Sequence, residues 1–319
     1  MKAMMEIRRS LRPWLDQVSA GEKVLVGVSG GIDSMALAYA LFQECGPRAI
    51  VAIPVVIDHG LQEGSAEIAH AVGSRLASVG YPKVEIRRVQ VEMADGLEGS
   101  ARRARYESFH ALIDHHGARY LFLGHTEDDQ AETVLLGLAR GSGTRSLSGM
   151  AKEIGPFIRP MLDLPRVITA SAVTEAGLVV WEDPHNSNQK FTRSRVRHQV
   201  LPLLEAELGP GIAPALARTA KILREDADAL DLLANEFLER NIASDLDVAQ
   251  LMALPKAIRA RVLRMAIYQV GAPAGSLSAD HLAPIEALIT GWKGQGPSSL
   301  PGGVKVERLS GRLSLSRGD

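Results

Sequence analysis

The sequence predicts an α/β protein: a twisted parallel sheet with helices on both faces, followed by a smaller, mainly helical domain with a terminal hairpin. Short apolar, β-branched segments alternate with helix-length segments through the first two-thirds of the chain. Such alternation implies right-handed βαβ crossovers and therefore a parallel sheet. Beyond residue 211, long helical segments replace this alternation. Because Gly and Pro cluster between Glu207 and Pro214, we predict one domain over residues 1–210 and a second over residues 211–319.

The elements of the first domain are predicted from these segments in chain order. An amphipathic helix over Met4–Val18 precedes the first strand, Lys23–Val28, which is short and rich in β-branched residues. Pro54 removes a hydrogen-bond donor from the second strand, so we expect a local irregularity there. The remaining segments predict strands at Ala49–Ile57, Val84–Val91 and Tyr120–Leu123, and helices at Met35–Glu44, Ala66–Val79, Ser100–His115 and from Asp129 onward.

The second domain is predicted to contain three helices and a hairpin. Helical patterns cover Ala215–Asn241, Asp247–Val270 and Ser278–Thr290. Two short alternating segments, Val304–Arg308 and Gly311–Leu315, follow them and predict the terminal antiparallel hairpin.

The composition is that of a globular protein. Apolar residues make up 46% and charged residues 23% of the 319, but aromatic residues only 4%, so the core must rest on Val, Leu, Ile and Ala. The formal net charge is −1. Any contact with nucleic acid must therefore come from local basic clusters.

The chain has one cysteine, Cys45. A single thiol excludes an intramolecular disulfide and any zinc or iron–sulfur site built from several thiolates of this chain. We predict that Cys45 is a buried, small apolar residue. The N-terminal segment lacks an apolar stretch long enough for a secretory signal, and no segment reaches the length of a membrane span. A cytoplasmic protein with no membrane partner is the resulting prediction.

The most informative motif lies between the first strand and its helix. It consists of Ser29, Gly30, Gly31, Ile32, Asp33 and Ser34. Adjacent glycines let the backbone approach an anion, and a helix N-terminus offers unpaired N–H groups and a positive dipole end. Ser34 or Asp33 is expected to cap the helix. The motif lacks the lysine of a GK[ST] loop and the G-x-G-x-x-G pattern. The alternative interpretation of this motif is an ordinary glycine turn. Its position between the first strand and the following helix favours a phosphate-binding loop.

This hexapeptide resembles the pyrophosphate loop (PP-loop) of the N-type ATP pyrophosphatases. That superfamily includes NAD and GMP synthetases, tRNA thiolation enzymes and lysidine synthetases. The resemblance implies an adenine nucleotide alpha hydrolase-like fold for residues 1–210. It also implies cleavage of ATP to AMP and pyrophosphate with Mg²⁺, through an adenylated intermediate. All six loop residues would then bind the nucleotide, and Asp33 would also be catalytic and hold the metal.

Further segments narrow the resemblance to one family. They are Asp58-His59-Gly60-Leu61, Ala101–Tyr106, Gly124–Thr133 with Arg140–Gly143, and Glu182–Asn186 with Phe191–Arg197. Over residues 23–205 these are similar to the lysidine synthetase patterns H-x-x-D-D-Q-x-E-T, R-G-S-G and E-D-x-x-N…F-x-R-N-x-[IVL]-R. Ser194 stands where the family pattern has asparagine. Serine keeps a donor and an acceptor but shortens the reach of the side chain.

The lysidine synthetase resemblance implies a specific ligase reaction, which forms a carbon–nitrogen bond. ATP adenylates the C2 oxygen of cytidine 34 in the CAU anticodon of tRNA(Ile), and free L-lysine then displaces AMP. Residues 211–319 would form a compact tRNA-binding domain. A homodimer is compatible with the sequence.

Several polar residues are assigned roles on this basis. Asp129 and Glu132, three apart on a helix, form an acidic face for the lysine ammonium or a metal, and are predicted to be catalytic together with Asp33 and Arg105. The general base stays open between one of these carboxylates and His125. The nucleotide-binding residues at strand ends are predicted to be Asp58, His59 and His125.

These polar residues also have structural alternatives. Asp128 and Asp129 could serve only as first-turn charges and an N-cap of their helix. His59 and His125 could be hydrogen-bonded structural groups.

A second set of arginines is assigned to tRNA binding. It comprises Arg102, Arg140, Arg193, Arg195 and Arg197. The last three alternate along the chain rather than following helical spacing, which favours phosphate contact over a solvated face. Neutralising them is expected to weaken tRNA binding and flatten its salt dependence.

Three rival functions remain at this level. A thiolating tRNA enzyme typically needs several cysteines, and Cys45 stands alone. An NAD or GMP synthetase-like amidating enzyme would act on a small molecule, which leaves the arginine segments without a purpose. A nucleotide sensor or RNA-binding module would lack turnover, and Asp33→Ala separates it from an enzyme, because only an enzyme loses ATP cleavage.

Overall fold

The computed structural model describes residues 2–60, 64–90, 97–141, 143–181, 189 and 191–318, with the side chains of residues 97 and 98 left out. Contacts between Cα atoms divide the chain into two compact units, Met1–Lys221 and Ile222–Asp319. The dividing point lies inside a long helix, whereas the sequence places its boundary at the loop before that helix. Each unit is described by itself.

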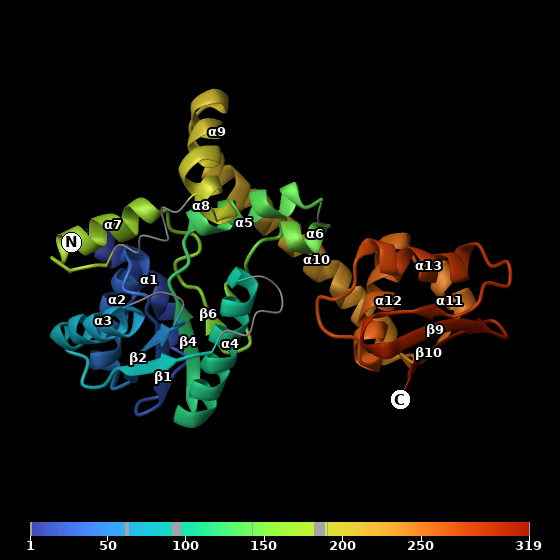
Figure 1. Cartoon of the computed structure of the whole chain (residues 1–319), viewed down its shortest axis with the longest axis horizontal. Helices are drawn as coiled ribbons and strands as arrows, with labels where there is room; N and C mark the ends of the chain where they lie inside the picture. The colour runs from blue at the N-terminus through green and yellow to red at the C-terminus, as the bar shows by residue number, and fades with distance from the viewer. Residues whose placement is uncertain are drawn as a thin grey trace. The chain divides into compact units, whose positions relative to one another are not determined.

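The first unit alternates strands and helices as the sequence predicts (Figure 1). Most predicted elements are found within a few residues of their expected ends, which is the usual uncertainty of helix and strand boundaries. The strands are β1 (Lys23–Gly27), β2 (Val51–Asp58), β3 (Glu85–Arg88), β4 (Ala118–Leu123), β5 (Glu153–Ile154) and β6 (Phe157–Ile158). The helices are α1 (Lys2–Leu15), α2 (Ile32–Cys45), η1 (Gly46–Arg48), α3 (Ser65–Val79), α4 (Leu97–His116), α5 (Glu127–Ala139), α6 (Thr144–Leu147), α7 (Arg166–Glu175), α8 (Thr192–Arg195), η3 (Val196–Val200) and α9 (Leu201–Leu208).

The strands of this unit form a mainly parallel sheet in the order β3-β2-β1-β4-β6-β5. Only β5 runs antiparallel to its neighbour. Helices cover both faces. On one face α1, α2 and α7 pack over the side chains of Val24, Val26 and Phe122, and on the other α4 packs over Leu25 and Leu121. Neighbouring residues of a strand point to opposite faces, so each apolar strand contributes side chains to the core on both faces of the sheet. The predicted fold class is confirmed.

The irregularity expected at Pro54 is absent. The register between β1 and β2 runs unbroken through the pair Val26–Pro54. On its other side, β2 pairs with β3 only from Val55 onward. Pro54 therefore lies where β2 has a partner on one side only, and its missing N–H disrupts no ladder bond.

The sequence did not predict β5, β6 or α7. The two strands have only two residues each, too few for a periodic pattern. Helix α7 begins directly after Pro165, which has extended backbone angles. A proline at the start of a helix is a recognised signal, and here it introduces a helix whose Arg166 and Thr169 contact Asp33.

A buried carboxylate fastens α1 to α2. Glu44 of α2 is 2% exposed, and it accepts hydrogen bonds from Arg8 Nε at 2.7 Å, Arg12 Nη2 at 3.2 Å and Arg48 Nη1 at 2.6 Å. Burial alone would raise the pKa of Glu44, but the three arginines outweigh it and lower the pKa from 4.5 to about 2. Glu44 is therefore ionised and paired with these arginines in the folded protein at ordinary pH.

We expect Glu44→Gln to destabilise the first unit by roughly 2 kcal/mol near pH 7, after discounting the shift for the partly solvated arginines. Because the pKa of Glu44 is depressed in the folded state, this stabilisation is present above pH 4.5 and is lost as the pH falls toward 2. Urea unfolding at pH 7 and pH 3 measures it. Equal differences between wild type and variant at both pH values would contradict the assignment.

The second unit consists of helices packed on a small antiparallel sheet with strand order β7-β10-β9-β8. Its apolar core is built from both layers, with Leu263 and Ile285 from helices and Val304 and Leu313 from strands. Its elements, beginning with the helix that starts in the first unit, are α10 (Ile212–Glu239), β7 (Asp245–Asp247), α11 (Val248–Ala253), α12 (Lys256–Val270), α13 (Ala279–Thr290), β8 (Ser298–Ser299), η4 (Pro301–Gly303), β9 (Val304–Leu309) and β10 (Arg312–Arg317).

One predicted helix of the second unit is wrong. The segment Asp247–Val270 forms two helices, α11 and α12, instead of one. Pro255 has no N–H for an internal helix bond, and it pushes the preceding Leu254 into extended angles of φ −75° and ψ 142°. The predicted terminal hairpin is confirmed. Its two-residue turn, Ser310-Gly311, has positive φ at both positions, which suits the twist of paired strands.

Among the described residues, no single helix has the length and apolar composition of a membrane span. The segments Thr192–Leu208 and Ile212–Glu239 reach that composition only as a pair bent by 100°.

Candidate active site

Four strand ends meet at the carboxyl edge of the first sheet. Strand β1 lies between β2 and β4, and all three are parallel. Ligands of open α/β sheets bind outside the carboxyl ends of the strands, where the chain leaves neighbouring strands toward opposite sides. The residues that follow β1, β2, β4 and β6 at this edge are Ser29–Ser34, Asp58–His59, His125 and Arg159.

The phosphate loop turns at Gly30, whose φ is +88°. A Cβ atom at this position would lie 2.5 Å from Cγ2 of Val72, so both the backbone angle and the space require glycine. The N–H of Trp181 donates to the Gly30 carbonyl at 2.9 Å. Helix α2 begins at Ile32, and its first N–H groups have no partner within the helix. They are available to an anion in the loop.

The predicted cap of α2 is wrong. Gly31 is the N-cap, and it makes no side-chain capping bond. Because the helix begins at Ile32, Ser34 lies inside its first turn. The Ser34 hydroxyl donates to the Gly31 carbonyl at 2.9 Å and accepts from the Ser29 N–H at 3.2 Å. It therefore closes the loop and leaves the helix end uncapped.

Gly124 brings the loop after β4 against the phosphate loop. A Cβ atom on Gly124 would lie 3.1 Å from the carbonyl carbon and oxygen of Asp33 and 3.2 Å from Cα of Ser34. Such a contact between two backbones leaves no room for a side chain. His125 is thereby placed beside the start of α2.

Helix α7 holds the carboxylate of Asp33. The hydroxyl of Thr169, which is fully buried, donates to Oδ1. Arg166 Nε donates to Oδ2 at 3.2 Å. Burial raises the pKa of Asp33, and the arginine and the threonine offset this only in part. Asp33 thus lies at the phosphate loop with both oxygens oriented by one helix.

The acidic pair, Asp129 and Glu132 of α5, lies on one helix face as predicted and is 6% and 0% exposed. Arg166 reaches both of its members. Its Nη2 donates to Asp129 Oδ1 at 3.0 Å, and its Nη1 lies 3.6 Å from Glu132 Oε1. One guanidinium therefore joins Asp33 to the acidic pair.

Arg193 and Arg197 also bind the acidic pair. Their Nε atoms donate to Oε2 and Oε1 of Glu132 at 2.7 and 2.6 Å. Their Nη2 atoms lie 3.3 and 2.9 Å from Oδ1 of Asp129. Together with Arg166 and Asp33, this gives a compact network in which guanidinium groups balance buried carboxylates.

This network fixes the charge state of Asp129. Burial alone would raise its pKa, but the positive charges of Arg166 and Arg193 outweigh burial and lower the pKa to about 2. Its other oxygen, Oδ2, accepts from the N–H and hydroxyl of Thr126 at 2.8 and 3.0 Å. Thr126 is the N-cap of α5. One oxygen of Asp129 therefore helps to cap α5, while the other binds the arginines of the network.

The strand-end histidines are half-buried at this edge. The Nδ1 atoms of His59 and His125 are buried and have no hydrogen-bond partner among the described residues. Burial lowers the pKa of His125 to about 3. The negative charge of Asp129 raises this pKa, whereas the positive charges of Arg159 and Arg193 lower it further. Burial and the charge of Arg105 also lower the pKa of His59. Each histidine thus brings to this edge a buried nitrogen atom that no described residue hydrogen-bonds.

Asp58 ends β2 at the same edge and is 5% exposed. Its Oδ1 accepts from the Gly60 N–H at 2.9 Å. Burial would raise its pKa, but the hydrogen bonds from Ser65 and Gly60 outweigh burial and lower it.

The arginines assigned to tRNA fall into different surroundings. The sequence pattern predicts that Arg193, Arg195 and Arg197 alternate without helical spacing, but they lie on α8 and η3. Arg193 and Arg197, four residues apart, come from successive turns and both enter the acidic network. Arg195 bonds locally to the Gln189 carbonyl at 2.8 Å and to a neighbouring hydroxyl.

The remaining predicted arginines lie outside that network. Arg102 and Arg105 share one face of α4, as predicted, with their Cζ atoms 4.9 and 5.9 Å from the Tyr106 ring centroid. Arg140 is exposed at the C-cap of α5. Cys45 is 2% exposed, and burial raises its pKa to about 12, which confirms the buried apolar role.

Sequence reasoning missed Arg166 and Thr169, although both contact Asp33. Their only local signal is Pro165, which marks a helix start. The predicted motif residues Leu61, Ser142 and Glu182–Asn186 lie outside the described residues.

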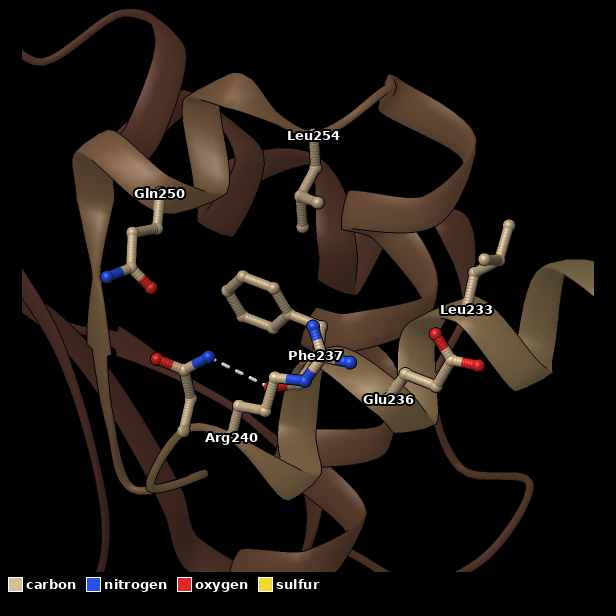
Figure 2. A pocket seen from close by; sticks show the side chains of 7 residues that line it. Leu233, Glu236, Phe237, Arg240, Gln250 and Leu254 are labelled. Carbon is tan, nitrogen blue, oxygen red and sulfur yellow. Dashed lines mark hydrogen bonds between the residues drawn. The ribbon is translucent and has the colours of Figure 1, made fainter.

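A separate cavity of about 450 Å³ lies in the second unit, between α10 and α11. Figure 2 shows the Phe237 ring at its centre, with Arg240, Gln250 and Leu254 around it. Asn241 Nδ2 donates to the Phe237 carbonyl at 2.8 Å. None of the predicted site residues lines this cavity. The sheet edge of the first unit, which gathers buried charges and unpaired donors, is therefore the candidate active site.

Two known domain families match this chain. The PP-loop domain family matches residues 3–204. The TilS substrate binding domain family matches residues 246–314. The first match covers more than half of the chain and contains every residue of the network described above.

Curated relatives are similar over nearly the whole length. The tRNA(Ile)-lysidine synthase of Thermobifida fusca is 47% identical, over 97% of this chain and 96% of that protein. The enzyme of the same name from Streptomyces coelicolor is 50% identical, over 92% of this chain and 85% of that protein. The one from Leifsonia xyli subsp. xyli is 48% identical, over 93% and 91%.

Among solved structures, the U34-tRNA thiolase NcsA from Methanococcus maripaludis with its [4Fe-4S] cluster has the same fold. The TM-score is 0.58 and the identity 19%, over 70% of this chain and 80% of that chain. At this identity the likeness concerns the fold alone, and Cys45 as the only cysteine gives no set of thiolates for a cluster. From its domain matches and its near full-length relatives, the chain belongs to the tRNA(Ile)-lysidine synthase family of PP-loop enzymes.

Proposed function

We propose that this chain uses ATP to adenylate the C2 oxygen of cytidine 34 in the CAU anticodon of tRNA(Ile), and that free L-lysine then displaces AMP to give lysidine. A ring carbonyl oxygen is a poor leaving group and AMP a far better one, so adenylation makes the attack feasible. Membership of the family supports this reaction, and the residues of the sheet edge offer groups for each part of it.

The nucleotide half of the reaction is assigned to the phosphate loop. Its glycines and the uncapped N-terminus of α2 favour the β- and γ-phosphates. Asp33 fits Mg²⁺, because this ion is commonly held by one or two carboxylates together with substrate phosphates and water. Mg²⁺ bound there would neutralise phosphate charge. His59, His125 and Asp58 would line the rest of the nucleotide site.

The amine half is assigned to the acidic pair. Asp129 and Glu132 are buried carboxylates suited to a lysine ammonium. Arg166, Arg193 and Arg197 pair with both carboxylates in the structure. We propose that substrate lysine shares this network, and that one carboxylate or His125 accepts the amine proton.

The RNA is assigned to the exposed Arg102 and Arg140, to the half-buried Arg195 and to residues 211–319. Arg193 and Arg197 would reach RNA only by leaving the acidic pair. Assembly into a homodimer stays a prediction, which sedimentation velocity would check. Cytoplasmic location also stays a prediction.

The observation that carries this proposal is the reach of Arg166. A single guanidinium contacts Asp33 at the phosphate loop and the acidic pair on α5. The proposed nucleotide and amine sites are therefore separated by no more than one side chain. An enzyme that forms an adenylate and then attacks it with an amine needs this proximity.

Incorporation of radiolabelled lysine into a tRNA(Ile) transcript with a CAU anticodon tests the proposal. We expect label in the tRNA only when ATP and Mg²⁺ are both present. A methionine tRNA with the same anticodon serves as the matched RNA control and should stay unlabelled. Pyrophosphate release that needs no lysine but depends on an added small carboxylic acid would instead favour an amidating synthetase.

A further inference from the structure

A second cluster of charged groups lies at the same sheet edge, outside the acidic network. It is built around Tyr106 of α4. Arg159, directly after β6, is 3% exposed, and its Nη2 donates to the Tyr106 hydroxyl at 3.1 Å. Arg102 Nη2 also points to that hydroxyl, at 3.4 Å. The cluster thus combines residues from α4 with the end of a strand that the sequence did not predict.

Arg159 is held firmly but is not fully bonded. Its Nη1 donates to the Ala151 carbonyl at 2.9 Å, which with the Tyr106 bond fixes the plane of the guanidinium. Its Nε is buried and has no hydrogen-bond partner among the residues that the structure describes. The same is true of the Nε of Arg105. A buried N–H group without an acceptor is costly, and it is usually paired with something that the free protein lacks.

Tyr106 adds another donor to this pair. Its hydroxyl oxygen accepts from two arginines, so its own hydrogen must be given to a different acceptor. The Cζ atom of Arg105 lies 5.9 Å from the centre of the same ring. The Tyr106 O–H and the Nε–H groups of Arg105 and Arg159 are therefore three donors at or near one ring, and none of them has an acceptor among the described residues.

No carboxylate balances this cluster within the part of the chain that the structure describes. The ion pairs that described residues form at this edge involve the arginines of the acidic network or, at Asp58, Arg88, and none of them involves Arg102, Arg105 or Arg159. A buried guanidinium without a counter-ion is unfavourable in the free protein. The positive charge is therefore available to an anionic ligand.

We propose that Arg105, Tyr106 and Arg159 form a phosphate-binding subsite of the active site, separate from the phosphate loop. The ligand is a phosphate oxyanion, since planar guanidinium groups and a phenol O–H match its oxygens. It belongs either to the nucleotide or to the RNA backbone beside the target cytidine. This inference rests on the proposed function, and it gives Tyr106 and Arg159 roles that no sequence motif assigned.

Binding measurements on the full chain test the subsite. The probes are the Mg²⁺ complex of the non-hydrolysable analogue AMPCPP and the tRNA(Ile) transcript, titrated calorimetrically into wild type, Tyr106→Phe and Arg105→Gln. Tyr106→Phe keeps the ring and removes only the O–H group. Arg103→Gln, an exposed neighbour on the same helix, is the matched control. Circular dichroism and thermal melting check that each variant is folded.

We expect Tyr106→Phe and Arg105→Gln to weaken one ligand by about fivefold to tenfold, and Arg103→Gln to leave both unchanged. Weaker AMPCPP binding with normal tRNA binding identifies a nucleotide phosphate. Weaker tRNA binding, with a smaller salt slope for Arg105→Gln, identifies an RNA phosphate. Affinities within twofold of wild type for both ligands in both folded variants would overturn the subsite. If wild type forms lysidine, that result leaves the proposed function intact; if wild type forms none, the proposed function fails first.

Discussion

Replacing Asp33 by asparagine should lower the rate of ATP cleavage by roughly 100-fold or more while the chain stays folded. The carboxylate lies at the start of α2, beside the phosphate loop, and both of its oxygens are oriented by Arg166 and Thr169. Asparagine keeps the shape and can still bond to Thr169, but it removes the negative charge that Mg²⁺ requires. Pyrophosphate release at saturating ATP, Mg²⁺, lysine and tRNA(Ile) measures the loss.

The matched control for Asp33 is Asp163→Asn, which removes an exposed carboxylate paired with Lys152. It should retain nearly full activity, because surface ion pairs contribute little. A metal-independent role for Asp33 would predict equal losses at all Mg²⁺ concentrations, whereas metal binding predicts partial rescue at high Mg²⁺. Activity above a tenth of wild type in Asp33→Asn would remove this residue from the catalytic assignment.

Replacing Glu132 by glutamine should have the largest effect on stability, about 3–5 kcal/mol. The side chain is fully buried and accepts from Arg193 Nε at 2.7 Å and Arg197 Nε at 2.6 Å. Glutamine would present an NH₂ group to one of these donors and leave the arginines facing Asp129 alone. Urea unfolding monitored by circular dichroism measures the change.

Glu153→Gln on the exposed strand β5 is the matched control for Glu132, and it should change stability by less than about 0.5 kcal/mol. If Glu132 also binds substrate lysine, the folded variant should show a raised KM for lysine at normal ATP affinity. A variant as stable as wild type would mean that the arginines find other partners at no cost, and the network would then have no structural role.

The fold could be predicted from the sequence because its signals are local. Apolar runs such as Lys23–Val28 and Tyr120–Leu123 mark strands whatever surrounds them, and their alternation with helices implies the parallel sheet. The turn of the loop after β1 was equally visible, since Gly30 meets a backbone requirement that is set within a few residues. The pairing of Asp129 with Glu132 on one helix face followed from helical geometry.

The sequence could not show which side chains contact the predicted site residues. Arg166 and Thr169 lie over 130 positions from Asp33, and no local pattern reports such a contact. The spacing of Arg193 and Arg197 was misjudged because the sequence does not show whether a charged segment is helical until its acidic partners are known. Arg159 likewise becomes notable only through its burial.

The sequence by itself thus determined the order of strands and helices, the anion loop and the chemical types of the site residues, because each depends on contacts between near neighbours in the chain. Only the tertiary structure decided which charged groups meet. It brings Arg166 and Thr169 of α7 to Asp33, pairs three arginines with the acidic pair, and leaves unpaired donors near Tyr106. The physical reason is that a buried charge is stable only where folding supplies its counter-charge, and that supply comes from segments far apart in sequence.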